Sequence, residues 1–289
     1  MLRYLSAIGM SRYTGTKAIS SWTKRYLDSH KDRPTPFSWP GSDETQLEFR
    51  HEMGPFRLVL KAYPEPGGVM HVYSALPSAR PGTISRLAGW ELGLEDTHLV
   101  VFGEDEVNGN PLVVRMEETG KMMNLPIPKG GENGSLHYAG LSIEGKIILG
   151  MLRTEEDEKV YEEEDRWRQE MLNKLRNGDQ EAMKAMEEEM AYQDQEIEAR
   201  MQHEDIFTVL EGFFMPVEDL FAGVYSTLGT ILDADKILNP ETEEWVWHLQ
   251  LDVMGSGLDV YIHPDDLVGV PLKGCRFLGK VLLVGSLRL

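Results

Sequence analysis

The chain has 289 residues, of which 41% are apolar and 9% aromatic, so it can bury a sizeable core and its composition excludes wholesale disorder. Its 48 acidic residues outnumber the 29 basic ones and leave a net charge of −19, a balance that argues against an unaided nucleic-acid binder. The single cysteine, Cys275, excludes an internal disulfide and a cysteine-based zinc site.

No segment of the sequence predicts a membrane helix. The longest charge-free apolar stretch, Leu220–Leu232, has 13 residues, whereas a spanning helix needs about 20. Residues 1–27 carry five basic residues and no acidic one, but they lack the pattern of a signal peptide, so we interpret them as containing an ordinary basic helix. These features lead us to expect a cytoplasmic protein that does not partner a membrane.

The distribution of charge divides the chain into three parts. Thr154–Asp205 holds 19 acidic and 7 basic residues, a net charge of −12, while the remaining 237 residues carry only −7. We therefore predict an α+β protein with a mixed, antiparallel-sheet domain at residues 1–152, an acidic helical arm and docking helix at 153–216, and a β-rich small barrel at 217–289. Whether the third part is a separate domain or completes the first is open at this point.

The first part combines one predicted helix with short strands. Thr16–Ser29 has apolar residues near helical spacing, and prolines at 34 and 36 disfavour its continuation. Strand-like apolar runs follow at Leu47–Arg50, Phe56–Ala62, Val69–Ala75, His98–Phe102, Leu112–Met116 and Leu136–Met151. Glu144 and Gly145 divide the last run and predict a tight hairpin. Short strands joined by such turns predict an antiparallel sheet.

The acidic part predicts an arm made of two helices. Apolar residues recur three, four or seven positions apart, first from Val160 to Leu175 and then in a methionine-rich row. This row, called the methionine stripe below, consists of Met183, Met186, Met190, Ile197 and Met201. The segment 177–179, Asn-Gly-Asp, supplies a helix stop and a new N-cap between the two helices. The apolar run Ile206–Met215, which ends before a proline, predicts a buried helix that docks the arm.

The third part is predicted to be rich in strands. Trp245–Val253 and Leu258–His263 alternate apolar and polar residues, and Lys280–Leu289 is almost continuously apolar. The two tryptophans of the first of these strands share a face with its leucines, which predicts that they pack in the core. Pro264–Asp266 predicts one helical turn. Four or five curled strands with such a turn make a small β-barrel, oligonucleotide-binding-like in outline, an analogy that concerns the fold only.

Short characteristic phrases are spread over most of the chain. They are Tyr4–Gly9, Gly140–Ile148, Glu204–Ile206, Phe213–Pro216, Asp265–Gly269 and Gly274–Gly279. With these phrases the chain resembles an uncharacterised bacterial family, known as a domain of unknown function, whose members are about this long. Cys275 stands where that family usually carries a second arginine before Arg276, so this position is not expected to be a required ligand. The resemblance implies a bacterial cytosolic protein and supplies no activity.

One polar cluster of the third part supplies the candidate ligand-binding residues. They are His248, His263, Asp265, Asp266 and Arg276. The two histidines lie on neighbouring predicted strands with the aspartates close by, so these side chains could meet in a cleft between the α+β body and the barrel. The oxygen-rich loop Glu104–Asn110 is better explained as a solvated hairpin loop than as a cation site. Since no zinc-helix spacing or hydrolase turn is present, we predict no catalytic residue, no metal and no cofactor.

Three functions agree with these features. The first is a non-catalytic interaction or scaffold protein, whose acidic arm presents the methionine stripe to a protein partner or to a second copy of the chain. The alternative is an enzyme or small-ligand binder with its site in the cleft between body and barrel. The third is weak binding of single-stranded nucleic acid through the barrel, which the acidic charge disfavours.

Overall fold

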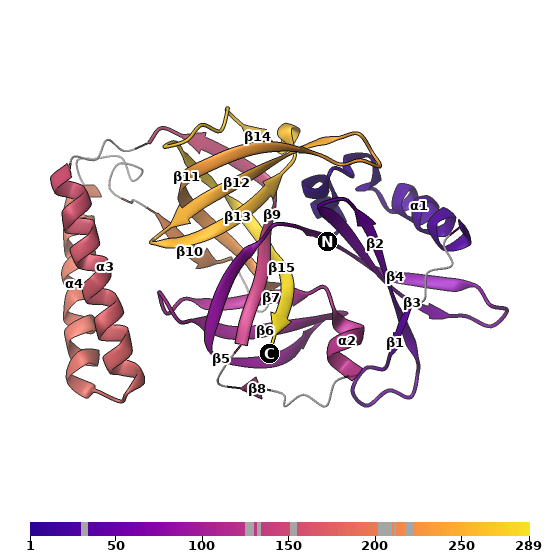
Figure 1. Ribbon diagram of the computed structural model, residues 1–289, viewed down its shortest axis with the longest axis horizontal. Coiled ribbons are helices and arrows are strands. Elements are labelled where there is room, and N and C mark those ends of the chain that lie inside the picture. Colours follow the sequence, from indigo (N-terminus) through magenta and orange to yellow (C-terminus); the bar gives the residue numbers. More distant parts are fainter. Residues whose placement is uncertain are drawn as a thin grey trace.

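The computed structural model describes residues 1–29, 34–124, 130–131, 134–150, 155–201, 210, 212–217 and 222–289. These residues form two sheets and a helical arm, so the prediction of a protein that combines helices and sheets is confirmed (Figure 1). The α-helices are α1 (Thr16–Ser29), α2 (Thr119–Asn124), α3 (Glu155–Arg176) and α4 (Gln180–Met201), and the shorter 3-10 turns are η1 (Leu2–Ile8), η2 (Ser11–Tyr13) and η4 (Pro264–Asp266). None of the helices in the described ranges is long and apolar enough to cross a membrane.

The first sheet has the order β1-β2-β3-β4 and is antiparallel throughout. Its strands are β1 (Thr35–Phe37), β2 (Gln46–Met53), β3 (Phe56–Pro64) and β4 (Met70–Ala79). Both α1 and η1 pack against β4. Apolar side chains of these elements, among them Ile8, Trp22 and Phe56, share one buried core with Leu141 and Leu282 of the second sheet. This shared core joins the two sheets.

The second sheet consists of two halves that follow the same plan, three antiparallel strands, a helical turn and one long strand. The first half contains β5 (Thr83–Glu95), β6 (His98–Asp105), β7 (Pro111–Met116), α2 and β9 (Gly134–Ile148). The second half contains β11 (Val224–Leu238), β12 (Trp245–Val253), β13 (Ser256–Ile262), η4 and β15 (Arg276–Arg288). Short strands complete the sheet, namely β8 (Gly130–Gly131), β10 (Phe213–Pro216) and β14 (Leu267–Val268).

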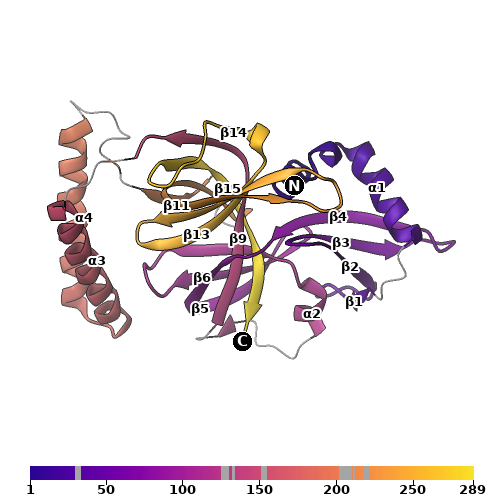
Figure 2. The same ribbon diagram turned by 45° about the horizontal axis from the view of Figure 1, so that its top comes forward.

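The long strand of each half pairs with strands of both halves. β9 and β15 pair antiparallel with each other, and each pairs antiparallel with the first strand of its own half, β5 or β11. The third strand of each half pairs parallel with the long strand of the other, β7 with β15 and β13 with β9. The registers of the two halves correspond. Thr83, the first residue of β5, pairs with Tyr138 of β9, and Val224, the first residue of β11, pairs with Leu282 of β15. The chain therefore contains an approximate internal two-fold repeat, and Figure 2 shows strands of the second half, such as β11 and β13, above those of the first half, such as β5 and β6.

The strands of residues 217–289 are hydrogen-bonded to strands of residues 1–152. The strand pairings close into a circuit in the order β11-β12-β13-β9-β15-β11. This circuit needs β9, which belongs to the first half. A small barrel built by residues 217–289 alone stays a prediction, as does the division into three domains. Several predicted elements are confirmed, namely the helix Thr16–Ser29, the strand Trp245–Val253, the turn Pro264–Asp266 and the two helices of the arm.

Three local predictions are wrong. Residues 144 and 145 do not form a hairpin, because β9 is continuous and its register against β15 shifts between Gly145 and Ser142. This shift is a bulge, in which an extra residue of one strand is accommodated without a turn. Phe213–Pro216 is strand β10 rather than the end of a helix, and residues 206–209 and 211 of the predicted helix Ile206–Met215 lie outside the described residues. Trp245 is 50% exposed rather than packed in the core.

Candidate functional site

The arm is an antiparallel pair of helices beside the second sheet (Figures 1 and 2). The connection between α3 and α4 follows the predicted chemistry, since Gly178 adopts a φ of 80° that glycine tolerates best. The carboxylate of Asp179 accepts hydrogen bonds from the backbone amides of Glu181 and Ala182 at 2.9 and 3.3 Å. Asp179 is therefore the N-cap of α4, and it satisfies amides that the first turn leaves without partners.

The end of α3 attaches the arm to the loop between β6 and β7. The guanidinium of Arg176 donates hydrogen bonds to the backbone carbonyls of Glu106 and Asp105, at 2.8 and 3.2 Å. Next to it, Leu172 lies so close to Gly109 that a Cβ atom at this glycine would be 3.1 Å from the leucine side chain. The loop predicted to be solvated is thus the docking point of the arm.

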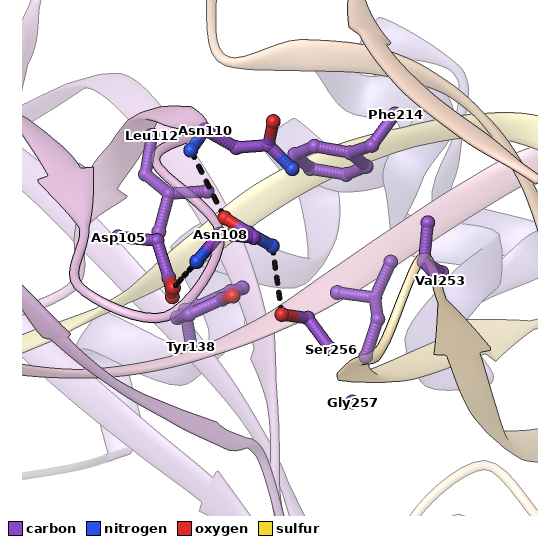
Figure 3. A pocket seen from close by; sticks show the side chains of 10 residues that line it. Asp105, Asn108, Asn110, Leu112, Tyr138, Phe214, Val253, Ser256 and Gly257 are labelled. Carbon is purple, nitrogen blue, oxygen red and sulfur yellow. Dashed lines mark hydrogen bonds between the residues drawn. The ribbon is translucent and has the colours of Figure 1, made fainter. Parts of the chain in front are cut away.

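Behind this loop lies a small recess, and the polar side chains that line it form hydrogen bonds that hold the loop (Figure 3). The carboxylate of Asp105 accepts hydrogen bonds from the amides of Val107 and Asn108, at 2.7 and 3.2 Å, and Asn108 donates to the hydroxyl of Ser256 at 2.7 Å. The space enclosed is about 20 Å³, which is room for about one water molecule. Within the described ranges, no group of three or more histidine, cysteine or acidic side chains is placed to hold a metal ion.

The methionine stripe lies at the side of α4 and is open to solvent. The contact between the helices buries Met171 of α3 and Ala182 of α4, which are 8% and 3% exposed. Met183 and Met190 are 51% and 60% exposed, and their separation of seven residues places them on one side of the helix. Met186 lies between them and is half-buried. The side chains of the last two stripe residues, at 197 and 201, lie outside the described residues.

The predicted polar cluster of the third part is divided among separate environments. His248 is buried, its Nε2 lies 2.6 Å from the carboxylate of Asp259, and its ring stacks on Tyr261. His263 accepts a hydrogen bond at Nδ1 from the amide of Asp265, whose side chain is exposed. No hydrogen bond joins the two histidines in this fully described part of the chain.

The other two members of the cluster also hold parts of the fold together. Asp266 accepts a hydrogen bond from the hydroxyl of Ser6 at 2.6 Å and so ties η4 to η1. Arg276 is 4% exposed and donates to the carbonyls of Leu149 and Leu210, at 3.2 and 3.0 Å. The role of these residues in ligand binding stays a prediction.

A row of buried polar residues that the sequence analysis missed lies where the two sheets meet. Glu48, Lys61 and Ser74 face one another across β2, β3 and β4. Lys61 is fully buried, and its ammonium donates to the carbonyl of Thr97 at 3.0 Å and lies 5.1 Å from the ring of Trp39. Burial lowers the pKa of Lys61 to about 8. No carboxylate forms an ion pair with Lys61 in the described structure.

His98 of β6 extends this row but is not arranged as a catalytic base. Burial, together with the charges of Lys61 and Arg115, lowers the pKa of His98 to about 3, so the ring is neutral. Its Nδ1 accepts from the guanidinium of Arg115 at 3.1 Å, and Nε2 therefore carries the proton and donates to the hydroxyl of Ser74 at 3.1 Å. A base that activates a serine needs the opposite arrangement, with a free lone pair toward the hydroxyl. The row is therefore a buried hydrogen-bond network, although a cavity of about 310 Å³ adjoins Ser74 and His98.

Taken together, the molecule is an α+β protein with a duplicated strand plan and an acidic helical arm inserted between the two halves. The family model described as "Domain of unknown function, E. rectale Gene description (DUF3881)" matches residues 98–285. This match covers more than half of the chain, so the chain belongs to that family, and the resemblance noted in the sequence is confirmed. No curated protein and no solved structure matches the chain. The matched segment runs from β6 into β15 and so includes the arm but not the first sheet.

Proposed function

We propose that the protein is a non-catalytic interaction protein whose arm binds a protein partner through the methionine stripe. The observation that carries this proposal is the exposure of Met183 and Met190, 51% and 60%, on a helix whose neighbouring side already packs against α3. Apolar side chains that lie exposed together are typical of interaction surfaces. Methionine suits such a surface, because its flexible and polarizable side chain adapts to the shape of a partner.

The charge of the arm favours a different protein over a second copy as the partner. Residues 154–205 carry a net charge of −12, so two arms would repel each other when brought together. Glu187 and Glu188 are exposed beside the stripe on α4. A partner that presents an apolar ridge flanked by lysines or arginines would match both the stripe and its acidic border.

The test compares capture of partners by the full chain and by two variants. In the first variant, Met183→Gln and Met190→Gln remove apolar contact area while keeping good helix formers. The matched control is Tyr192→Gln, because Tyr192 is 58% exposed and lies on the opposite side of α4 from Met190. Tagged proteins are used to capture partners from a lysate of the source organism, and bound proteins are quantified by mass spectrometry, after circular dichroism has shown equal helix content.

We expect the same partner with the wild type and the control, and its loss with the double variant. Burial of a methionine side chain contributes roughly 1.5–3 kcal/mol, so the Kd of the purified pair should rise at least tenfold. Binding should also weaken as salt is added, because the acidic border attracts a basic rim. A partner retained equally by the double variant contradicts the proposal. A dimer of the chain itself that depends on the two methionines contradicts the charge argument.

A further inference from the structure

A second recess, formed without any residue of the arm, lies at the end of β9 and β15 near the C-terminus that Figure 1 marks. It encloses about 290 Å³, and its walls come from the ends of β4, β7, β9 and β15. The recess therefore lies where the first sheet meets both halves of the second sheet. Its volume is close to the lower end of the range of roughly 300–1,000 Å³ that is typical of small-molecule sites.

Three side chains with nitrogen donors line this recess, and most of those donors have no partner. The side chain of Arg80 is 50% exposed and uses one nitrogen, Nη2, on Glu117, although a guanidinium offers five N–H groups. His137 is half-buried and Arg288 is exposed. Neither of these two side chains makes a hydrogen bond or ion pair in the part of the chain that the structure describes.

The one carboxylate that lines the recess is already paired with arginines. Glu117 is 2% exposed and accepts hydrogen bonds from the hydroxyl of Ser78 at 2.5 Å and from Arg80 at 2.6 Å, with Arg57 at 3.1 Å. Burial alone would raise the pKa of Glu117, but the Ser78 hydrogen bond and the two arginines hold it below its ordinary value. Glu117 therefore holds Arg80 at the recess, and its charge is already balanced by two arginines.

Charge and backbone shape both suit a small anion. Arg57, Arg80 and Arg288 stand against Glu117 and Glu52, the latter bound to Arg57 at 2.5 Å. Among the residues that line the recess, Arg80 and Arg288 against Glu117 leave one positive charge, in a chain whose net charge is −19. The walls are held by a close approach of backbones, since a Cβ atom at Gly285 would lie 2.1 Å from the carbonyl oxygen of His137. His137 and Arg288 are thus carried by tightly packed strands, while Arg80 lies in the short connection between β4 and β5 and is held by Glu117.

We propose that this recess binds a small metabolite through an anionic group, a phosphate or a carboxylate, held by Arg80, His137 and Arg288. Arginine is the side chain best suited to both groups, because its planar fork can donate two parallel hydrogen bonds to neighbouring oxygens. The volume fits a compact metabolite. This site is separate from the arm and does not rest on the interaction proposed above.

The test measures binding of two anionic probes by isothermal titration calorimetry in a low-salt buffer that contains no phosphate. Inorganic phosphate represents the first ligand class and succinate the second. The variants are Arg288→Gln and His137→Gln, which alter the recess without touching the buried ion pairs of Glu117. The matched control is Lys273→Gln, which removes the same charge as the arginine variant from an exposed position before the opposite end of β15.

We expect the wild type to bind one probe more tightly than the other, which identifies the ligand class. The control should bind equally well, while loss of a charge-assisted hydrogen bond should weaken binding by roughly ten- to a hundredfold in each recess variant. The double methionine variant of the arm should bind the probe as the wild type does. Absence of binding for both probes overturns the proposal, and so does binding that is unchanged by Arg288→Gln and His137→Gln.

Discussion

Replacement of the buried Lys61 by methionine should stabilise the protein at neutral pH. The ammonium of Lys61 is fully buried with one hydrogen bond, to the carbonyl of Thr97, and no carboxylate partner in the described structure. Methionine has nearly the same shape and no charge, so Lys61→Met removes a buried charge while keeping most of the packing. A buried charge without a partner is costly enough that an apolar residue of similar volume is often the more stable choice.

The magnitude follows from the pKa of Lys61, which burial lowers from 10.5 to about 8. This difference corresponds to about 3 kcal/mol of unfavourable free energy for the charged form in the folded state. The folded state binds the proton of Lys61 more weakly than the unfolded state does, so the wild type is destabilised by the full amount below pH 8. This destabilisation disappears as the pH rises from 8 toward 10.5. The carbonyl of Thr97 loses a donor in the variant, which costs about 1 kcal/mol. The variant should therefore be about 2 kcal/mol more stable at pH 7.

Urea unfolding of both proteins between pH 7 and pH 10 provides the measurement. The advantage of Lys61→Met should shrink by about 2 kcal/mol over this range, because only the wild type loses its penalty. The exposed Lys273→Met serves as the control and should change neither the stability nor its dependence on pH. A stability difference between wild type and Lys61→Met that stays constant across the range would refute the reasoning, since it would show that Lys61 does not titrate there.

Three further predictions concern single contacts. Glu117→Gln should cost about 2 kcal/mol at pH 7, because it removes the carboxylate paired with Arg80 and one of the two paired with Arg57. Since the pKa of Glu117 is lowered in the folded state, urea unfolding should show this difference above the ordinary value of 4.5, and the difference should disappear as the pH falls through the lowered pKa. Asp179→Ala should destabilise the start of α4 by about 1 kcal/mol, measured as faster amide hydrogen exchange there, and Asp179→Asn should retain the cap. Gly285→Ala should cost about 3 kcal/mol in urea unfolding, because its Cβ would meet the His137 carbonyl at 2.1 Å, whereas Gly257→Ala, which meets nothing within 4 Å, should be neutral.

Local sequence patterns predicted many elements of the fold but not the pairing of its strands. Alternation located the strand Trp245–Val253 through its second half, where the apolar residues from Leu249 to Val253 are buried and the polar residues between them are not. The same type of signal failed at Glu144 and Gly145, since an acidic residue followed by glycine is equally typical of a turn and of a bulge. The parallel pairs β7–β15 and β13–β9 join segments more than a hundred residues apart. Such pairs depend on the packing of the whole molecule and leave no local signal.

The candidate sites were predictable to different degrees for the same reason. The methionine stripe could be found because the helical repeat places its members on one side of one helix. The recess around Arg80, His137 and Arg288 could not, since these residues come from two strands and a connection that are distant in sequence, and they share no motif. Lys61 offered a weak signal, a charge inside the strongly apolar run 56–62, which is compatible with either a solvated or a buried position. Only the contact of β3 with the second sheet decides whether Lys61 is solvated or buried.

The duplicated plan of the second sheet explains why the two proposed sites can act independently. β9 and β15 each hold strands of both halves, so neither half can complete its pairings without the other. The walls of the anion recess include both long strands, which makes its geometry a property of the joined halves. The arm instead lies in the connection between β9 and β10, and it touches the body through Arg176 and Leu172 at the end of α3. A partner can therefore bind or displace the arm without separating the strands that shape the recess.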